Sequence, residues 1–224
     1  GDNFLFYNKY LEKISVSNVV RIGSSFLYSN SLITNLDFSK LLEIKDDFLT
    51  MNKIIEYINM PNVISIGNNF LSNNLKLRFI YMNYLNKVGD NFLCKNKIID
   101  KVSLLNLMYV GDRFLQCNTG LKELLLGRLI YVGNWFVSAN KFINKVDFSS
   151  LQEVGDNFLY CNNSLCELFL YNLIKVGRNF LCCNRCLSCF FAPYLEVVGN
   201  RFFYRNENIT LENNNNNIIR KKIM

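Results

Sequence analysis

The sequence contains no histidine, only two prolines and one tryptophan, and only 19% of its 224 residues are charged. Without histidine the chain lacks the most common general base and a frequent metal ligand, and we find no nucleophile beside a base and no converging carboxylates. It also has no apolar run of about 18 residues, the length that a membrane-spanning helix needs, and we recognise no signal-peptide pattern in it. We therefore predict a protein that is not an enzyme, holds no cofactor or metal, and has no membrane span.

What the chain does have is a motif led by glycine that recurs at a fixed spacing. Half of the residues are hydrophobic, which excludes a largely disordered chain. The motif is clearest in VGDNFLYCN at residues 154–162 and VGRNFLCCN at residues 176–184. The interval between successive glycines is constant, and it doubles only across the one repeat in which Lys45 takes the place of glycine. With glycine as position 1, each of the ten repeats runs to position 22, and the glycines are Gly1, Gly23, Gly67, Gly89, Gly111, Gly133, Gly155, Gly177 and Gly199.

Two columns of the repeat are the same in all ten copies. Position 4 is phenylalanine: Phe4, Phe26, Phe48, Phe70, Phe92, Phe114, Phe136, Phe158, Phe180 and Phe202. Position 8 is asparagine: Asn8, Asn30, Asn52, Asn74, Asn96, Asn118, Asn140, Asn162, Asn184 and Asn206. Because a buried amide must find hydrogen-bond partners, we interpret the asparagine column as a structural ladder rather than a ligand site. The motif also lacks the second glycine and the Lys-Ser/Thr ending of a phosphate-binding loop.

The full pattern, G-x-x-F-L-x-x-N-x-x-L-x-x-L-x-L-x-x-L-x-x-V, is typical of a solenoid. A single unit of this length cannot bury so many apolar columns, whereas stacked units bury them as one core. The L-x-x-L-x-L portion at positions 11 to 16 predicts a short strand in a parallel sheet that runs along the stack. We expect the glycine at a corner with positive φ, and a helical or 3-10 turn over positions 4 to 8 on the opposite side.

The spacing L-x-x-L-x-L joined to V-x-x-V-G-x-x-F-L-x-x-N resembles a leucine-rich repeat of the BspA-like, or Treponema pallidum type, subclass. The resemblance implies an α/β fold: a solenoid of ten repeats over residues 1–211, with the parallel sheet on a concave face and short helical turns opposite. The sequence departs from the subclass in three ways. Its repeat ends at position 22, one residue short of the usual length; it has Phe-Leu where Ala-Phe is usual; and it has asparagine where cysteine is common. Residues 212–224, with five asparagines followed by IIRKKIM, predict a tail.

The eight cysteines all lie between Cys94 and Cys189, most densely in CCNRCLSC at residues 182–189. That spacing could suggest a metal site, but the repeat places these side chains at positions that point to different sides of the coil. Cys161 and Cys183 share position 7 in adjacent repeats and are the one plausible disulfide, which we do not expect because adjacent coils rarely orient the β-carbons suitably. Unpaired cysteines favour a reducing compartment, whereas the resemblance also allows a cell surface or secreted protein.

The outward positions 13, 15, 17 and 18 of the strand portion carry two groups of aromatic residues. The candidate partner-binding residues are Tyr57, Phe79, Tyr81 and Tyr84 in repeats 3 and 4, and Phe169, Tyr171, Phe191 and Tyr194 in repeats 8 and 9. Between the groups, position 13 alternates in charge through Lys101, Glu123, Lys145 and Glu167, which predicts a cross-strand ladder of ion pairs. Exposed rings clustered on a sheet commonly mark a contact surface, although a flanking segment could also cover them.

Position 9 carries a basic residue in every odd repeat, at Lys9, Lys53, Lys97, Lys141 and Arg185. Together with the net charge of +7, this basic edge raises the possibility of a nucleic-acid partner. Acidic residues such as Glu56 and Asp100 lie close by, so a solvated face fits the pattern better than a phosphate track.

These patterns favour a non-enzymatic scaffold that binds a protein or peptide on the face of the sheet, in adhesion or as an adaptor. The alternative is a module that binds a glycan or a nucleic acid through the basic edge together with the exposed aromatic residues.

Overall fold

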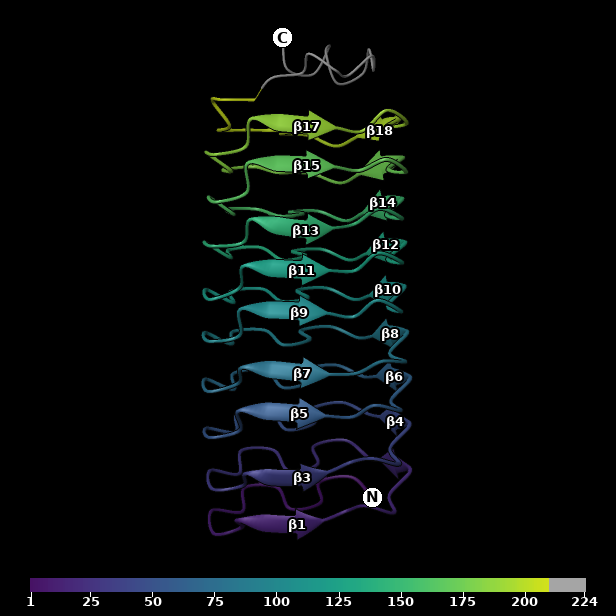
Figure 1. Ribbon diagram of the computed structural model, residues 1–224, viewed down its shortest axis with the longest axis vertical. Coiled ribbons are helices and arrows are strands. Elements are labelled where there is room, and N and C mark those ends of the chain that lie inside the picture. Colours follow the sequence, from purple (N-terminus) through teal and green to yellow (C-terminus); the bar gives the residue numbers. More distant parts are fainter. Residues whose placement is uncertain (210–224) are drawn as a thin grey trace.

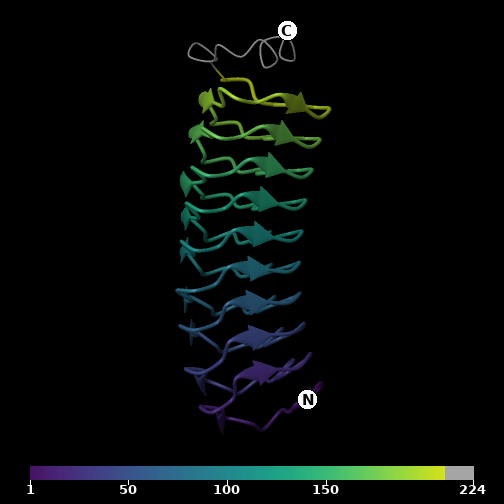
Figure 2. The same cartoon turned by 90° about the vertical axis from the view of Figure 1, so that its right-hand side faces the viewer.

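The computed structural model describes residues 1–209, which form one column of stacked coils with a period of 22 residues (Figures 1 and 2). The predicted tail at 212–224 lies outside the described residues. Each of the first nine coils contributes one strand of three residues and one of two, and each strand pairs in parallel with strands of neighbouring coils. The three-residue strands are β1 (Lys13–Ser15), β3 (Asn35–Asp37), β5 (Tyr57–Asn59), β7 (Phe79–Tyr81), β9 (Lys101–Ser103), β11 (Glu123–Leu125), β13 (Lys145–Asp147), β15 (Glu167–Phe169) and β17 (Cys189–Phe191). The two-residue strands are β2 (Arg21–Ile22), β4 (Glu43–Ile44), β6 (Ser65–Ile66), β8 (Lys87–Val88), β10 (Tyr109–Val110), β12 (Tyr131–Val132), β14 (Glu153–Val154), β16 (Lys175–Val176) and β18 (Val197–Val198).

The predicted α/β class is wrong, because the chain is a β-solenoid with no helix anywhere in residues 1–209. The expected helical or 3-10 turn at positions 4 to 8 is instead a segment in which positions 3, 5 and 7 of every coil have φ between 49° and 64°. Their N–H groups donate between coils: Ser25 to the carbonyl of Asp46 at 2.8 Å, and Leu27 to the carbonyl of Phe4 at 3.1 Å. Since these donors are used by neighbouring coils, no helical turn forms. With no helix present, none in this range could cross a bilayer.

The prediction that the glycine of position 1 has a positive φ is wrong, because no glycine has one. Glycine is required there for a steric reason instead. A β-carbon at Gly111 would lie 2.8 Å from the carbonyl carbon of Gly89 and 2.9 Å from the nitrogen of Asp90, and it would also overlap the Asp90 carboxylate. Coils therefore approach each other too closely at position 1 for a side chain. Lys45 is the one residue at position 1 that is not glycine. The coil before it has a serine, Ser24, at position 2, whereas the other coils have Asp, Asn or Arg there.

The core is one continuous file of apolar columns. The phenylalanines of position 4 stack from coil to coil with ring centroids 5.2 to 5.7 Å apart and interplanar angles of 3° to 14°. From Phe26 to Phe202 these rings are buried, and the apolar residues of positions 5, 11, 14, 16, 19 and 22 pack around them. The burial that the repeat pattern predicted is thus present, although it is built by strands and turns alone.

The predicted asparagine ladder is present in the structure. Asn30, Asn52, Asn74, Asn96, Asn118, Asn140, Asn162 and Asn184 are all fully buried. In most coils the side-chain oxygen accepts the backbone N–H of the asparagine one coil earlier, as in Asn52 N–H to Asn74 at 2.9 Å. The amide nitrogen donates to the position 5 carbonyl of the preceding coil, as in Asn52 to Leu27 at 3.0 Å. The ladder is interrupted at Asn140, whose buried oxygen has no partner.

The two kinds of strand form different sheets. The two-residue strands make one uninterrupted sheet of nine strands from β2 to β18, whereas the three-residue strands pair as β1-β3, β5-β7, β9-β11-β13 and β15-β17. Two of the three breaks follow a coil with phenylalanine at position 16, namely Phe38 before β5 and Phe148 before β15. The Phe148 ring lies edge-on to Phe136 and Phe158, at 5.6 and 6.0 Å. We attribute both breaks to this extra ring, whereas side-chain size does not explain the third, because methionine occupies position 16 both there and inside the intact pair β5-β7.

Candidate functional site

All eight predicted aromatic residues lie on the face formed by the three-residue strands and the turns that follow them, which we call the strand face. Seven of them are more than 40% exposed: Tyr57, Phe79, Tyr81, Tyr84, Phe169, Tyr171 and Tyr194. Phe191 is half-buried. The face is the side of a stacked column rather than the concave side of a horseshoe (Figures 1 and 2).

The first aromatic group is built on β5 and β7, which pair residue for residue. The rings of Tyr57 and Phe79 occupy the same position in the two strands and stack at 6.0 Å between centroids. Two residues further along β7, the Tyr81 hydroxyl accepts a hydrogen bond from the side chain of Asn83 at 2.6 Å. Tyr84 is 61% exposed. The group therefore presents a flat apolar area with a polar margin.

The second group is built on β15 and β17. Phe169 and Tyr171 stack with centroids 6.3 Å apart, and the Tyr171 ring meets Phe191 edge-on at 5.6 Å. Tyr194 is the most exposed of the four, at 66%. Four strand spacings separate β7 from β15, so the two groups lie roughly 20 Å apart along the column.

Between the two groups, the predicted ladder of charges forms over three of its four members. The Glu123 carboxylate lies 2.6 Å from the Lys145 ammonium and 3.0 Å from that of Lys101. Hydrogen bonds from Lys145 and then Lys101 hold the pKa of Glu123 below its usual value. Glu167, the fourth member, makes no ion pair within residues 1–209, because the break between β13 and β15 separates it from Lys145.

That break opens a cleft of about 310 Å³ in the strand face. Lys145, Asp147 and Ser149 line one side of it, and Glu167, Phe169 and Tyr171 line the other. Two of the predicted aromatic residues therefore border a hollow instead of lying on a flat surface. A cleft rimmed by rings and carboxylates can hold an inserted side chain.

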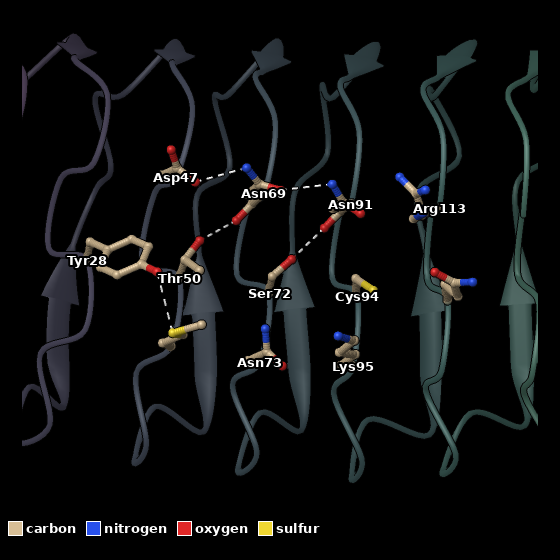
Figure 3. Close-up of a pocket in the computed structure, with 12 residues that line it drawn as sticks. Tyr28, Asp47, Thr50, Asn69, Ser72, Asn73, Asn91, Cys94, Lys95 and Arg113 are labelled. Atoms are coloured by element: carbon tan, nitrogen blue, oxygen red, sulfur yellow. Dashed lines mark hydrogen bonds between the residues drawn. The ribbon is translucent and has the colours of Figure 1, made fainter.

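A second hollow of about 430 Å³ lies on another face, formed by positions 3, 6 and 7 of coils 2 to 6 (Figure 3). Its side chains form a polar chain along the column: Asn91 donates to Asn69, and Asn69 donates to Asp47, both at 2.9 Å. Arg113 follows in the same column and Tyr28 borders the other end (Figure 3). We call this hollow the polar groove.

The basic edge is exposed at all five of its predicted residues, Lys9, Lys53, Lys97, Lys141 and Arg185. These side chains occupy position 9, whereas the aromatic groups occupy positions 13 to 18. No pocket residue of the strand face or the polar groove belongs to the basic edge.

All eight cysteines are free thiols, including Cys161 and Cys183. Burial raises the pKa of Cys94 to about 11 and that of Cys182 to about 11, so both thiols stay protonated near neutral pH. Among the side chains that the structure describes, no three of Cys, Asp or Glu gather in a way that could hold a metal ion.

The sequence interpretation missed two polar columns that the structure brings out. Asp or Asn at position 2 accepts the N–H of position 2 in the next coil, as in Asp112 N–H to Asp90 at 2.8 Å. Asp47, Asn69 and Asn91 at position 3 form the hydrogen-bonded chain in the polar groove. Both columns are rich in Asp and Asn in the sequence, and that enrichment was the available signal.

The chain matches no protein-family model, and no curated protein and no solved structure is significantly similar to it. A repeat solenoid is established by the structure, and membership of the BspA-like subclass stays a prediction.

Proposed function

We propose that the protein is a scaffold that binds a protein or peptide across its strand face. The observation that carries the proposal is the exposure of two ring clusters on the paired strands β5-β7 and β15-β17 of the strand face. Tyr and Phe side chains on such a surface lose little conformational entropy when they bind, and they bury a large apolar area.

The partner that fits this face is an extended segment. The two aromatic groups lie roughly 20 Å apart, a distance that about six extended residues can span. The pairs between Lys101, Glu123 and Lys145 occupy the intervening surface and leave few unpaired charges there. An extended peptide could therefore anchor apolar residues at both ends and cross a polar middle. An adhesion role, which the BspA-like resemblance implies, is one setting for such binding.

A displayed library of random linear peptides, selected on the full chain, tests the proposal. We expect the selected peptides to lose about 2 kcal/mol, or roughly 30-fold in Kd, with Tyr81→Ala or Phe169→Ala. The matched control is the Lys97→Glu/Lys141→Glu variant, which reverses two charges on the basic edge and should mainly change the association rate. Selected peptides that bind both aromatic variants as well as the wild type, yet lose binding to the control, would place the site elsewhere.

A glycan is the second candidate ligand, and the polar groove favours it more than the basic edge does. The aligned amides of Asn69 and Asn91 offer donors and acceptors to the hydroxyl groups of a sugar, and Tyr28 offers a ring on which a sugar can stack. A glycan array probed with the wild type and with Asn91→Ala tests this role. Signals that are equal for the two proteins would remove the groove from consideration.

A further inference from the structure

The cleft between β13 and β15 contains charge that the protein itself does not neutralise. Asp147 and Glu167 line it from opposite sides, and neither forms an ion pair within residues 1–209. One oxygen of Asp147 accepts the backbone N–H of Ser149 at 3.1 Å, which fixes the direction of the carboxylate. These two side chains give the cleft an acceptor on each wall.

The one cation that lines the cleft is engaged outside it. The Lys145 ammonium lies 2.6 Å from Glu123, on the far side of β13 from the cleft. Glu123 is largely covered, with 20% of its side chain exposed, and it also binds Lys101. Lys145 is therefore held away from Glu167, and the cleft keeps an excess of negative charge.

Rings complete the site. Phe169 and Tyr171 stack nearly parallel, at an interplanar angle of 14°, and both line the cleft. A cation over an aromatic face is attracted by the ring electrons, and a planar guanidinium can stack on a ring while it binds carboxylates. Rings and two carboxylates around one hollow are what a basic side chain requires.

We propose that this cleft receives an arginine or lysine side chain of the bound peptide, so that the partner carries a basic residue at this point. The inference rests on the proposed peptide-binding function and adds the chemistry of its partner. The protein has a net charge of +7, so a cationic ligand is repelled overall and must be drawn to a local site.

Labelled pentaarginine, pentacitrulline and pentaglutamate serve as probes of the full chain in fluorescence anisotropy at low and at physiological salt. Citrulline keeps the shape of arginine without its charge. We expect pentaarginine to bind at least tenfold more tightly than the other two peptides, and more tightly at low salt. Glu167→Gln and Asp147→Asn should each weaken its binding at least fivefold. Glu12→Gln, which removes an exposed carboxylate in the first coil, should leave it unchanged.

The inference fails if pentaarginine binds no better than pentacitrulline, or if Glu12→Gln weakens binding as much as the two cleft variants do. Circular dichroism and thermal melting of each variant check that the column is intact. Binding of the peptides selected for the proposed function, measured with these variants, separates the claim of peptide binding from the claim of a basic side chain in the cleft. If their binding depends on Tyr81 and Phe169 but not on Glu167 or Asp147, the peptide-binding function stands. The claim that the cleft receives a basic side chain of the peptide is then wrong. If their binding depends on neither set, the strand face is not the binding site, and both the proposed function and this inference are wrong.

Discussion

The side-chain oxygen of Asn118 accepts the backbone N–H of Asn96 at 2.8 Å, and its amide nitrogen donates to the carbonyl of Leu93 at 2.9 Å. Both bonds lie between coils in a fully buried part of the molecule. Asn118→Ala removes the acceptor of a buried N–H, so we expect the free energy of unfolding to fall by about 1 to 3 kcal/mol. Chemical denaturation with circular dichroism as the readout measures this change.

Asn140→Ala is the matched control for that prediction, because the Asn140 oxygen accepts no hydrogen bond. Asn140→Ala removes a donor to backbone carbonyls, but it takes no acceptor away from a backbone N–H. The free energy of unfolding should therefore fall by less than in Asn118→Ala. Equal losses in the two variants would mean that the contact between Asn96 and Asn118 contributes nothing of its own.

A second prediction concerns the close approach of coils at position 1. Gly111→Ala places a β-carbon against the backbone of Gly89 and Asp90, and overpacking of this kind should cost about 1 to 3 kcal/mol. Asp90→Ser/Gly111→Ala copies the arrangement of Ser24 before Lys45, and should cost less than the sum of the single changes by about 0.5 kcal/mol or more. A double-mutant cycle from thermal melts measures the coupling, and strict additivity would show that the position 2 side chain plays no part in the glycine requirement.

The third prediction concerns the ring that opens the cleft. Leucine occupies position 16 at Leu104 and Leu126, and their N–H groups donate to the next coil at 3.1 and 3.0 Å. Phe148→Leu should allow the same bond from residue 148 to Phe169, so that β13 and β15 pair. We expect hydrogen exchange at the amide of residue 148 to slow at least tenfold, and the affinity for pentaarginine to fall.

Phe38→Leu is its control, because it changes the equivalent break before β5 and leaves the cleft untouched. Binding of pentaarginine should be the same as for the wild type. If Phe148→Leu leaves the exchange rate at residue 148 unaltered, the ring does not cause the break.

The fourth prediction uses the raised pKa values of Cys94 and Cys182. At pH 8 iodoacetamide should modify the exposed Cys166 and Cys186 first, because the buried thiols are covered and carry almost no thiolate below pH 9. Since the folded pKa is higher than the value of 9.0 for a free thiol, the neutral form stabilises the fold below pH 9. That contribution should be lost as the pH rises from 9 to about 11. Mass spectrometry of peptides from timed reactions reports the order, and rapid modification of Cys94 at pH 8 would contradict it.

The repeat length, the buried columns and the asparagine ladder could all be predicted, because each depends only on which residues recur. The conformation between positions 2 and 7 could not. Leucine at position 5 gives no sign of a left-handed φ, which bulky residues rarely adopt, and here it follows from hydrogen bonds to the coils on either side. The helical turn was predicted from a local pattern, whereas the segment is determined by its neighbours.

The charge ladder shows the same limit at a single side chain. The alternation of Lys101, Glu123, Lys145 and Glu167 predicted four linked residues, and the last link is missing because of Phe148, three positions further along the chain from Lys145. Phe148 was visible as a phenylalanine in a column of mostly smaller residues. Its effect on strand pairing depends on how the core accommodates a second ring, which sequence alone does not state.

All coils share one register, so the number of coils in the column can change, whereas the alignment of positions between adjacent coils cannot. Adding or removing a whole coil in the middle of the column returns every asparagine, glycine and phenylalanine to an equivalent neighbour, so the array can grow or shrink by units. Inserting a single residue into a coil shifts its later columns out of step with both adjacent coils at once. The separation of the two ring clusters can therefore change in steps of one coil, and the spacing of anchors in a matching ligand would change by the same steps.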